Sequence, residues 1–190
     1  METPSGAEFI SPVHVRHVMR YVNAGKYIPP HSLILDAACG TGYGSKILAK
    51  TCNSIVIGLD ASSQAIAEAE REYSNDCKFR ITDLFAAKYA AVDAIVSIET
   101  IEHFSRIDGM RLVQKFHDWL SPEGILVLST PYCSHSGPSP ITKQHLWEYS
   151  LTDFEMLLND CGFKIDGIQL DRHEGQAGRL GYCMVKAIKK

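Results

Sequence analysis

One segment near the N-terminal end of the chain joins an apolar run directly to a cluster of glycines. Leu33–Ala37 is a short aliphatic run around one acid, and Gly40, Gly42 and Gly44 follow at every second position. A helix-forming stretch, Ser45–Thr51, comes next. Glycine lets a backbone turn sharply and approach a ligand without a clash from Cβ. The segment therefore predicts a buried strand, a ligand-binding turn and a helix, which is a building unit of α/β proteins.

Apolar strand-like runs alternate with helical patterns further along the chain. Runs rich in Ile, Val and Leu suit strands that are buried on both faces of a parallel sheet. The predicted strands are Leu33–Ala37, Ser54–Leu59, Lys78–Ile81, Ala94–Ile98 and Ile125–Ser129, and the helices between them are Ser62–Tyr73 and Ile107–Leu120. This alternation predicts a doubly wound, Rossmann-like α/β sheet with helices on both faces.

The last third of the chain repeats the pattern once. Ser150 and Asp153 have the spacing of a capping box, which predicts that a helix begins there. Gly162 lies where a glycine commonly ends a helix. Two further strands, Phe163–Leu170 and Gly181–Ala187, are joined by a glycine-rich connection and are predicted to form an antiparallel hairpin.

Two details of the glycine segment argue against a dinucleotide. The third glycine of G-x-G-x-x-G would fall at position 45, which is Ser45, so the spacing here is G-x-G-x-G. Asp36 lies just before the loop. A carboxylate there is unhelpful beside a pyrophosphate, but it suits a ligand that carries an ammonium group.

Two more acids end the second and third predicted strands. Asp60 follows Gly40 at the spacing at which an acid accepts hydrogen bonds from ribose hydroxyls. Asp83 can accept a hydrogen bond from an adenine amino group, with Leu84 and Phe85 against the ring. An amino acid, a ribose and an adenine without phosphate describe S-adenosylmethionine.

The motifs also carry a family resemblance over nearly the whole chain. DAACGTGYG (Asp36–Gly44), GLDAS (Gly58–Ser62), TDLF (Thr82–Phe85), SIETIEHF (Ser97–Phe104) and LSPEGILVLSTP (Leu120–Pro131) occur in one order. In this order they resemble the class I S-adenosylmethionine-dependent methyltransferases, and among them the methyltransferase-11 and ubiquinone-biosynthesis-like group. The resemblance implies a seven-stranded sheet with strand order 3-2-1-4-5-7-6 and an antiparallel seventh strand. It implies these cofactor-binding residues: Asp36, Ala38, Gly40, Gly42, Tyr43, Asp60, Ala61, Asp83, Leu84, Ser97 and Glu99.

The reacting methyl group of such a fold emerges beyond the fourth strand. The Asn/Asp-Pro-Pro-aromatic motif of DNA-base amino-methyltransferases is missing there, as is the Pro-Cys nucleophile of cytosine C5 chemistry. A hydroxyl acceptor benefits from a base that removes its proton. His103 is the nearest candidate base, His145 is the second, and Glu102 completes the predicted catalytic set.

The same residues raise a metal hypothesis. Glu99, Glu102 and His103 stand at i, i+3 and i+4, which places them on one face if the turn is helical. With His145 they would offer two carboxylates and two imidazoles to a divalent ion. Metal-dependent 2′-O-methyltransferases of small-RNA 3′ ends and ubiquinone-biosynthesis O-methyltransferases show a similar E-x-x-E-H pattern. Many relatives share it without an assigned metal, so the metal-free interpretation is favoured and the metal alternative stays open.

Acceptor recognition is expected from short segments. The polar stretch Pro131–Gln144 has the character of a binding loop, or else of a plain connector. Tyr132, Trp147 and Tyr149 are predicted to line the acceptor pocket, together with His135.

Residues 13–24 are predicted to form a helix over the cofactor site, from which His17, Arg20 or Tyr21 could reach a ligand. Residues 1–12 are predicted to be flexible. Arg172, His173 and Arg179 form a local basic cluster in the final hairpin, whose default interpretation is a solvated turn.

Length and charge set the remaining bounds. The chain has 190 residues, which corresponds to about one domain. Its net charge of -3 argues weakly against a broad grip on nucleic acid. No apolar targeting or membrane-spanning segment is evident in the sequence. Six scattered cysteines without a CxxC pair are typical of reduced thiols in a cytoplasmic protein.

These observations predict an S-adenosylmethionine-dependent methyltransferase that acts on the oxygen of a small-molecule or glycan-type acceptor. Two alternatives stay open: a metal-dependent RNA 2′-O-methyltransferase, and a cofactor-binding module that is inactive without a partner. A homodimer is compatible with the sequence. Since nearly all residues are assigned to the sheet and its helices, a rather open acceptor site is expected.

Overall fold

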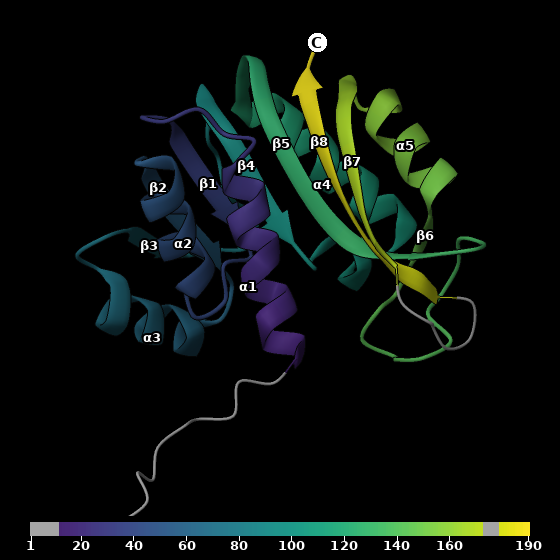
Figure 1. The fold of residues 1–190 in the computed structure, drawn as a ribbon, viewed down its shortest axis with the longest axis horizontal. Helices are drawn as coiled ribbons and strands as arrows, with labels where there is room; N and C mark the ends of the chain where they lie inside the picture. Colours follow the sequence, from purple (N-terminus) through teal and green to yellow (C-terminus); the bar gives the residue numbers. More distant parts are fainter. Residues whose placement is uncertain (1–11, 173–178) are drawn as a thin grey trace, which may run out of the picture.

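A computed structural model describes residues 12–172 and 179–190 of the chain. The prediction for residues 1–12 falls, apart from its last residue, outside the described residues, and so do His173 and most of the glycine-rich connection. The ribbon in Figure 1 shows one layer of strands with helix α1 in front of it and helix α4 behind it. Among the described residues, no helix combines the length and the apolar character that a membrane crossing needs.

The sheet has the order β3-β2-β1-β4-β5-β8-β7, and a short strand, β6, pairs with β5 outside this path. Its strands are β1 (Leu33–Ala37), β2 (Ile55–Asp60), β3 (Lys78–Ile81), β4 (Val92–Ile98), β5 (Leu120–Cys133), β6 (Tyr149–Ser150), β7 (Phe163–Arg172) and β8 (Arg179–Lys189). Only β8 runs antiparallel to its neighbours, β5 and β7. Apart from β6, which the sequence did not indicate, this is the predicted topology.

Five α-helices cover the two faces. They are α1 (Pro12–Gly25), α2 (Tyr43–Cys52), α3 (Ser63–Tyr73), α4 (Arg106–Trp119) and α5 (Leu151–Asp160). Neighbouring strand residues point to opposite faces, so Ile34 joins one hydrophobic core with α1, α2 and α3, while Leu35 joins a second core with α4 and α5. The sheet is therefore buried on both sides, as the aliphatic runs predict.

Serine residues begin three of the helices. Ser62, Ser105 and Ser150 each accept a hydrogen bond from a backbone N–H in the first turn, at 3.2, 3.1 and 3.1 Å. These bonds satisfy donors that a helix start otherwise leaves unpaired. The predicted capping box at Ser150 is thus confirmed in its N-cap bond, and Gly162, with φ +88°, follows the end of α5 as predicted.

Strand β5 is longer than the sequence indicated. The prediction of a loop from Pro131 is wrong for its first three residues, because Pro131, Tyr132 and Cys133 still pair with β8. The aliphatic pattern ends at Ser129, but the antiparallel partner continues to supply hydrogen bonds beyond it. The extension carries the chain past the end of β4, where the candidate site lies.

Candidate functional site

The glycine loop connects β1 to α2 through backbone conformations that favour glycine. Gly40 and Gly42 have φ values of +54° and +81°. A Cβ at Gly40 would meet nothing within 4 Å, whereas one at Gly42 would lie 2.7 Å from the Cβ of Ala69. Gly40 thus leaves open space beside the backbone, and Gly42 lets α3 approach. The loop is the turn between strand and helix that the sequence predicts, and its residues are half-buried or buried.

Asp36 is completely buried behind this loop. Ser45 Oγ donates a hydrogen bond to it at 2.6 Å, and the Tyr21 hydroxyl donates a second at 3.3 Å. Burial raises the pKa of the Asp36 carboxyl to about 7, against the effect of these two hydrogen bonds. Ser45, which stands where a dinucleotide loop has its third glycine, therefore holds the carboxyl of Asp36.

The other two strand-end acids are more accessible. Asp60 Oδ2 accepts the backbone N–H of Gly40 at 2.9 Å, and its Oδ1 accepts that of Ser62 at 2.8 Å. Asp83 is exposed and accepts the N–H of Phe85 at 2.6 Å. Asp60 thus ties the glycine loop to the second strand, and both carboxylates lie at the carboxyl edge of the sheet, where α/β proteins bind ligands.

The remaining predicted cofactor residues line the same edge. Ala38 has a φ of +65°. The Tyr43 ring packs edge-on against Tyr21, with 5.8 Å between ring centroids. Ser97 Oγ donates a hydrogen bond to the Ala37 carbonyl at 3.1 Å. Leu84 is buried, whereas Ala61 is exposed.

Glu99 ends β4 in a strained conformation. Its φ is +52°, in the left-handed region that side chains with a Cβ rarely adopt. Ser129 Oγ donates a hydrogen bond to its Oε1 at 2.7 Å. Burial raises the pKa of Glu99 to about 7, although the positive charge of Arg20 opposes the shift. Such strain at the end of a strand is typical of a functional site.

Glu102 lies in the short 3₁₀ turn η1 (Ile101–His103) and is fully buried. Thr130 Oγ1 donates to its Oε2 at 3.0 Å, while Oε1 has no hydrogen-bond partner among residues 12–172 and 179–190. Burial, followed by the negative charge of Glu99, raises its pKa well above the ordinary value. A buried, unpaired carboxyl oxygen is costly, so its position calls for a ligand or a proton.

The expectation that Glu99, Glu102 and His103 share one face is only partly met. Ligand atoms of Glu102, His103 and His145 all lie within 4.8 Å of one another, and Glu99 does not belong to this group. Glu99 bonds to Ser129 and Glu102 to Thr130, and successive residues of a strand point to opposite faces. The structure therefore brings together three of the four predicted metal ligands.

The two histidines face each other across the site with 5.0 Å between ring centroids. Nδ1 of His103 lies 3.0 Å from the carbonyl oxygen of Gln144, and Nδ1 of His145 lies 2.9 Å from Oε1 of Glu148. The carbonyl oxygen of Gln144 can only accept, so Nδ1 of His103 carries a proton. Nδ1 of His145 lies between an acceptor, Glu148 Oε1, and a donor, Arg179 Nη2, at 3.1 Å. Imidazole nitrogens of this kind can take up a proton or bind a metal ion.

Comparisons with known proteins agree with this arrangement. Residues 34–124 match the family model described as a methyltransferase domain. Phosphoethanolamine N-methyltransferase 3 of Arabidopsis thaliana is 32% identical over 148 residues, covering 72% of this chain and 30% of the relative. The chain belongs to the class I S-adenosylmethionine-dependent methyltransferases.

Two other similarities broaden the comparison. A 2-methyl-6-phytyl-1,4-hydroquinone methyltransferase of Synechocystis is 29% identical over 133 residues, covering 67% of this chain and 41% of the relative. The solved magnesium protoporphyrin IX methyltransferase of Synechocystis, with bound S-adenosylhomocysteine, has a TM-score of 0.75 at 18% identity and covers 99% of this chain and 90% of that one. The chain spans about a third of the length of the phosphoethanolamine methyltransferases it matches.

The residues of this site fit the family's cofactor, S-adenosylmethionine. The open space at Gly40 leaves room for a ligand against the backbone, and the carboxylates of Asp60 and Asp83 are acceptors for hydroxyl and amino groups. The loop offers no lysine or arginine that would favour a phosphate. The predicted assignment of the individual cofactor contacts stays a prediction.

Sequence reasoning missed Glu148 and misjudged Arg179. Glu148 is 1% exposed and forms a salt bridge with Arg179, whose Nε donates to Oε2 at 3.3 Å and whose Nη2 donates to Oε1. The default interpretation of Arg179 as part of a solvated turn is therefore wrong. Burial lowers the pKa of His145, and the hydrogen bond to Glu148 opposes this shift. Glu148 thus holds the orientation of His145, at 2.9 Å from its Nδ1.

The predicted acceptor residues lie apart from the two histidines. Tyr132 and Tyr149 are buried in the core beneath α4 and α5, and Tyr149 packs against Phe154 with 5.6 Å between ring centroids. Trp147 lies under Arg106, whose guanidinium is 6.0 Å from the ring centroid. His135 is exposed. Their role in acceptor binding stays a prediction.

The N-terminal helix carries its three candidates at the side of β1 and β8. Arg20 stacks on the ring of Tyr182, 4.0 Å from its centroid. His17 Nδ1 lies 3.4 Å from the hydroxyl of Tyr43, and Tyr21 bonds to Asp36. The helix therefore reaches the start of α2, the buried Asp36 of β1 and Tyr182 of β8. Its place over the cofactor stays a prediction.

Proposed function

We propose that this chain transfers the methyl group of S-adenosylmethionine to an oxygen atom of a small-molecule or glycan-type acceptor, and that His103 and His145 receive the acceptor's proton. The observation that carries the proposal is the pair of imidazoles that lie with 5.0 Å between ring centroids beyond the end of β4. Proton removal by a positioned base is worth about 10²–10⁴ in rate for such acceptors.

The bound cofactor supplies a methyl group on a positively charged sulfur. The chain's part is to hold the reacting groups close and to accept the proton. The glycine loop and Asp60 form the proposed seat for the nucleoside. The lowered pKa of His145, caused by burial, keeps its imidazole neutral near neutral pH and thus able to take a proton.

The comparisons support a small-molecule acceptor more directly than an oxygen acceptor. The relatives named above are, by name, methyltransferases of phosphoethanolamine nitrogen and of a hydroquinone. A neutral imidazole also serves an ammonium acceptor, which must lose a proton before nitrogen can attack. Acceptor panels that pair an alcohol or phenol with the matching amine separate the two reactions, and a strict preference for the amines would contradict the oxygen assignment.

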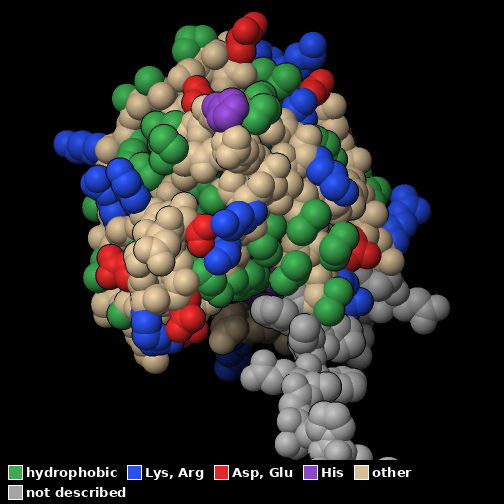
Figure 2. Space-filling model, turned by 60° about the vertical axis from the view of Figure 1, so that its left-hand side comes forward, with side chains coloured by type: hydrophobic (Ala, Val, Ile, Leu, Met, Phe, Trp, Pro, Cys, Tyr) green, Lys and Arg blue, Asp and Glu red, His purple; other side chains and the backbone are tan. Residues whose placement is uncertain are grey.

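A second candidate is metal-dependent methyl transfer to an RNA 2′-hydroxyl. It is favoured by the clustering of Glu102, His103 and His145 and by the unpaired Oε1 of Glu102. Two imidazole nitrogens and a carboxylate suit Mn²⁺, Fe²⁺, Co²⁺ or Zn²⁺. Against RNA, the face in Figure 2 shows lysine, arginine and acidic side chains interspersed, without a continuous basic surface among the described residues drawn there. The metal-free reaction is therefore the first proposal.

The test is transfer of a labelled methyl group to an acceptor panel by wild type, His103→Ala, His145→Ala and the control His31→Asn. His31 is an exposed histidine before the amino end of β1, at the opposite edge of the sheet, and asparagine tolerates its φ of +65°. We expect the first two variants to lose about 10²-fold or more in kcat, and the control to keep wild-type rates. Equal activity in all four would contradict the proposal.

Two further measurements separate the alternatives. Loss of activity on chelation, with recovery on added Mn²⁺ or Mg²⁺, would support the metal-dependent candidate over the metal-free one. Binding of S-adenosylhomocysteine in calorimetry without transfer to any acceptor would support a module that needs a partner.

A further inference from the structure

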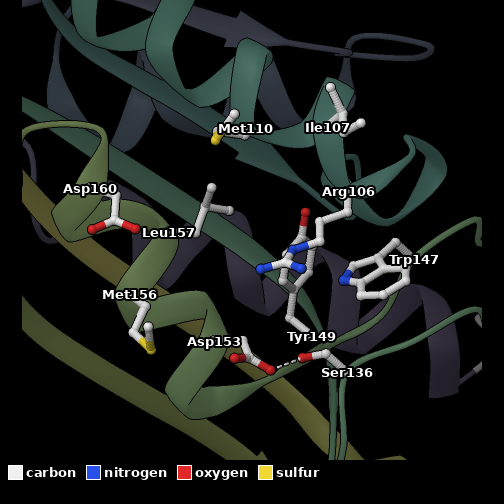
Figure 3. A pocket seen from close by; sticks show the side chains of 10 residues that line it. All are labelled: Arg106, Ile107, Met110, Ser136, Trp147, Tyr149, Asp153, Met156, Leu157 and Asp160. Carbon is white, nitrogen blue, oxygen red and sulfur yellow. Dashed lines mark hydrogen bonds between the residues drawn. The ribbon is translucent and has the colours of Figure 1, made fainter.

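A cavity of about 490 Å³ lies between α4 and α5, on the side of the sheet that carries Trp147 and Tyr149. Figure 3 shows the helix α5 on one side of it and Arg106 and Trp147 on the other. Its volume falls within the range of about 300–1,000 Å³ that small-molecule sites occupy. Its lining includes none of the catalytic or cofactor residues named above.

Large apolar side chains stand exposed around this cavity. Ile107, Met110 and Met156 are 61%, 47% and 55% exposed, and all three belong to its lining. Single exposed apolar residues are common, but a group of them around one concavity marks a binding site. Methionine and isoleucine walls accommodate a flexible hydrocarbon body.

One face of α5 brings two carboxylates into the lining. Asp153 lies in the first turn of the helix, and Asp160 is its last residue, two turns or about 10 Å further along the axis. Met156 and Leu157 lie between them on the same face, as Figure 3 shows. The α5 wall of the cavity is therefore an apolar stretch with an acid at each end.

Asp153 already has its positive partner. Hydrogen bonds from Ser136 and Ser150, and after them the positive charge of Arg106, hold the pKa of its carboxyl below the ordinary value. Arg106 is the one basic residue in the lining, and its guanidinium lies over the Trp147 ring, 6.0 Å from the centroid. Its charge thus offsets that of Asp153, at the Trp147 end of the cavity.

Asp160 leaves the other end of the cavity negative. Figure 3 shows it on the side away from Trp147 and Arg106. It is exposed, and in the part of the chain that the structure describes it forms no ion pair. The last turn of α5 contains no basic residue, although the C-terminal end of a helix carries a partial negative charge that favours cations. An acid at such a position breaks a local rule without compensation, which is typical of a functional site.

We propose that this cavity binds a small amphiphilic cation, whose ammonium group meets Asp160 and whose hydrocarbon body lies along Met110 and Met156. Two carboxylates against one guanidinium give the lining a net negative charge, and the carboxylate without a partner stands beside the exposed apolar side chains. The site is separate from the glycine loop and the two histidines, so it does not depend on the proposed methyl transfer.

Binding of three ligands with one chain length tests the proposal: octylammonium, octanol and octanoate. Calorimetry and tryptophan fluorescence report binding to the chain without cofactor. We expect octylammonium to bind about fivefold more tightly than octanol, the size of an ion pair near the surface, and octanoate to bind more weakly than both. The preference for the cation should shrink as salt is raised to about 0.5 M, because salt screens exposed charges. Equal binding of the three ligands would overturn the proposal.

Variants of exposed residues assign the preference to its groups. Asp160→Asn is expected to bring octylammonium binding down to that of octanol. Glu155→Gln is the matched control, since Glu155 is another acid of α5 and does not line the cavity. Arg106→Gln should strengthen octylammonium binding, because it removes the one positive charge of the lining. An unchanged preference in Asp160→Asn would contradict the assignment.

The apolar part of the site has its own test. Met156→Gln should weaken the binding of all three ligands by a similar factor, because each of them lays the same hydrocarbon chain on this wall. Sedimentation over a range of protein concentrations examines the other possible occupant, a second copy of the chain. A dimer that Met156→Gln dissociates would show that a second copy covers the cavity, and would overturn the proposal.

Discussion

Asp36 combines complete burial with a carboxyl that titrates near neutral pH. An unfolded aspartate releases its proton near pH 3.9, whereas burial raises the pKa of folded Asp36 to about 7. Between these values the folded state holds a proton that the unfolded state has lost, so stability falls as pH rises. We expect this group to cost up to about 4 kcal/mol between about pH 4 and pH 7. Asp36→Asn removes that cost and still offers an acceptor to Ser45 and Tyr21.

Urea unfolding of wild type and Asp36→Asn at a series of pH values checks this expectation. The stability of the variant relative to wild type should grow as pH rises through the window. The raised pKa values of Glu99 and Glu102 also make the unfolding free energy fall as pH rises. They do so in both proteins, so their contributions cancel in the difference between the two profiles. A constant offset between the two profiles would contradict the assignment of the titration to Asp36.

Glu148 and Arg179 affect His145 in opposite directions. The Glu148 carboxylate raises the pKa of His145 through their hydrogen bond, and the positive charge of Arg179 lowers it. In Glu148→Gln we expect kcat to fall about 10–100-fold, as for outer partners of a functional histidine, and the acidic limb of the pH–rate profile to move to lower pH. In Arg179→Gln the limb should move to higher pH.

Glu68→Gln, on the exposed side of α3, controls for the loss of one negative charge. The KM for S-adenosylmethionine should stay within about twofold in Glu148→Gln, since the carboxylate does not face the glycine loop. A purely structural role would lower the amount of folded enzyme in both variants without moving the two acidic limbs apart.

The residues whose position the sequence predicted are those that directly follow a strand. Asp60 and Asp83 each follow a strand, and parallel strands bring their carboxyl ends to one edge. The partnership of Glu148 could not be seen in this way. His145 lies in an irregular segment, and Arg179 comes from a strand beyond a separate helix and strand. Only the folded chain brings Glu148, His145 and Arg179 together, and no periodic pattern in the sequence indicates this contact.

Among the elements, helices α1 and α2 meet more closely than their sequences indicate. A Cβ on Gly44 would overlap the Tyr21 ring, so Gly44 is what lets α1 lie on α2 and bring Tyr21 to Asp36. We expect Gly44→Ala to destabilise the fold by about 1–3 kcal/mol through overpacking and to weaken cofactor binding. Thermal unfolding and calorimetry measure the two effects.

Gly167→Ala in β7 is the matched control, because its Cβ would meet only Lys186, at an ordinary 4.0 Å. That variant should unfold near the wild-type temperature and bind the cofactor normally. Unchanged stability in Gly44→Ala would show that α1 can shift without loss, and that its contact with α2 does not position Tyr21.

Element types were predictable where one residue pattern decides them. Alternating burial and serine caps placed the main strands and helices within a few residues. The turn after β4 was less predictable, because three residues are too few for a period. It is a 3₁₀ turn, so the α-helical spacing used for Glu99, Glu102 and His103 does not apply. Strand β6, only two residues long, exists because β5 offers it an edge.

At the scale of the whole molecule, cofactor binding and folding are linked. A ligand that binds only the folded state stabilises it by RT ln(1 + [L]/Kd), about 2.7 kcal/mol at a hundredfold excess over Kd. For a chain of this size each kcal/mol raises Tm by about 2–4 °C, so saturating S-adenosylhomocysteine should raise Tm by about 5–10 °C. Asp60→Ala removes the acceptor that holds the Gly40 N–H and should abolish most of the shift. Asp118→Ala, which changes an exposed acid of α4, should keep the shift.

NAD and ATP are the decisive comparison ligands, because both carry adenine and ribose but place phosphates against the loop. If Ser45 in place of a glycine and the carboxyl of Asp36 exclude phosphates, neither ligand will match the shift. An equal shift with NAD would contradict the assignment of the loop to a phosphate-free nucleoside.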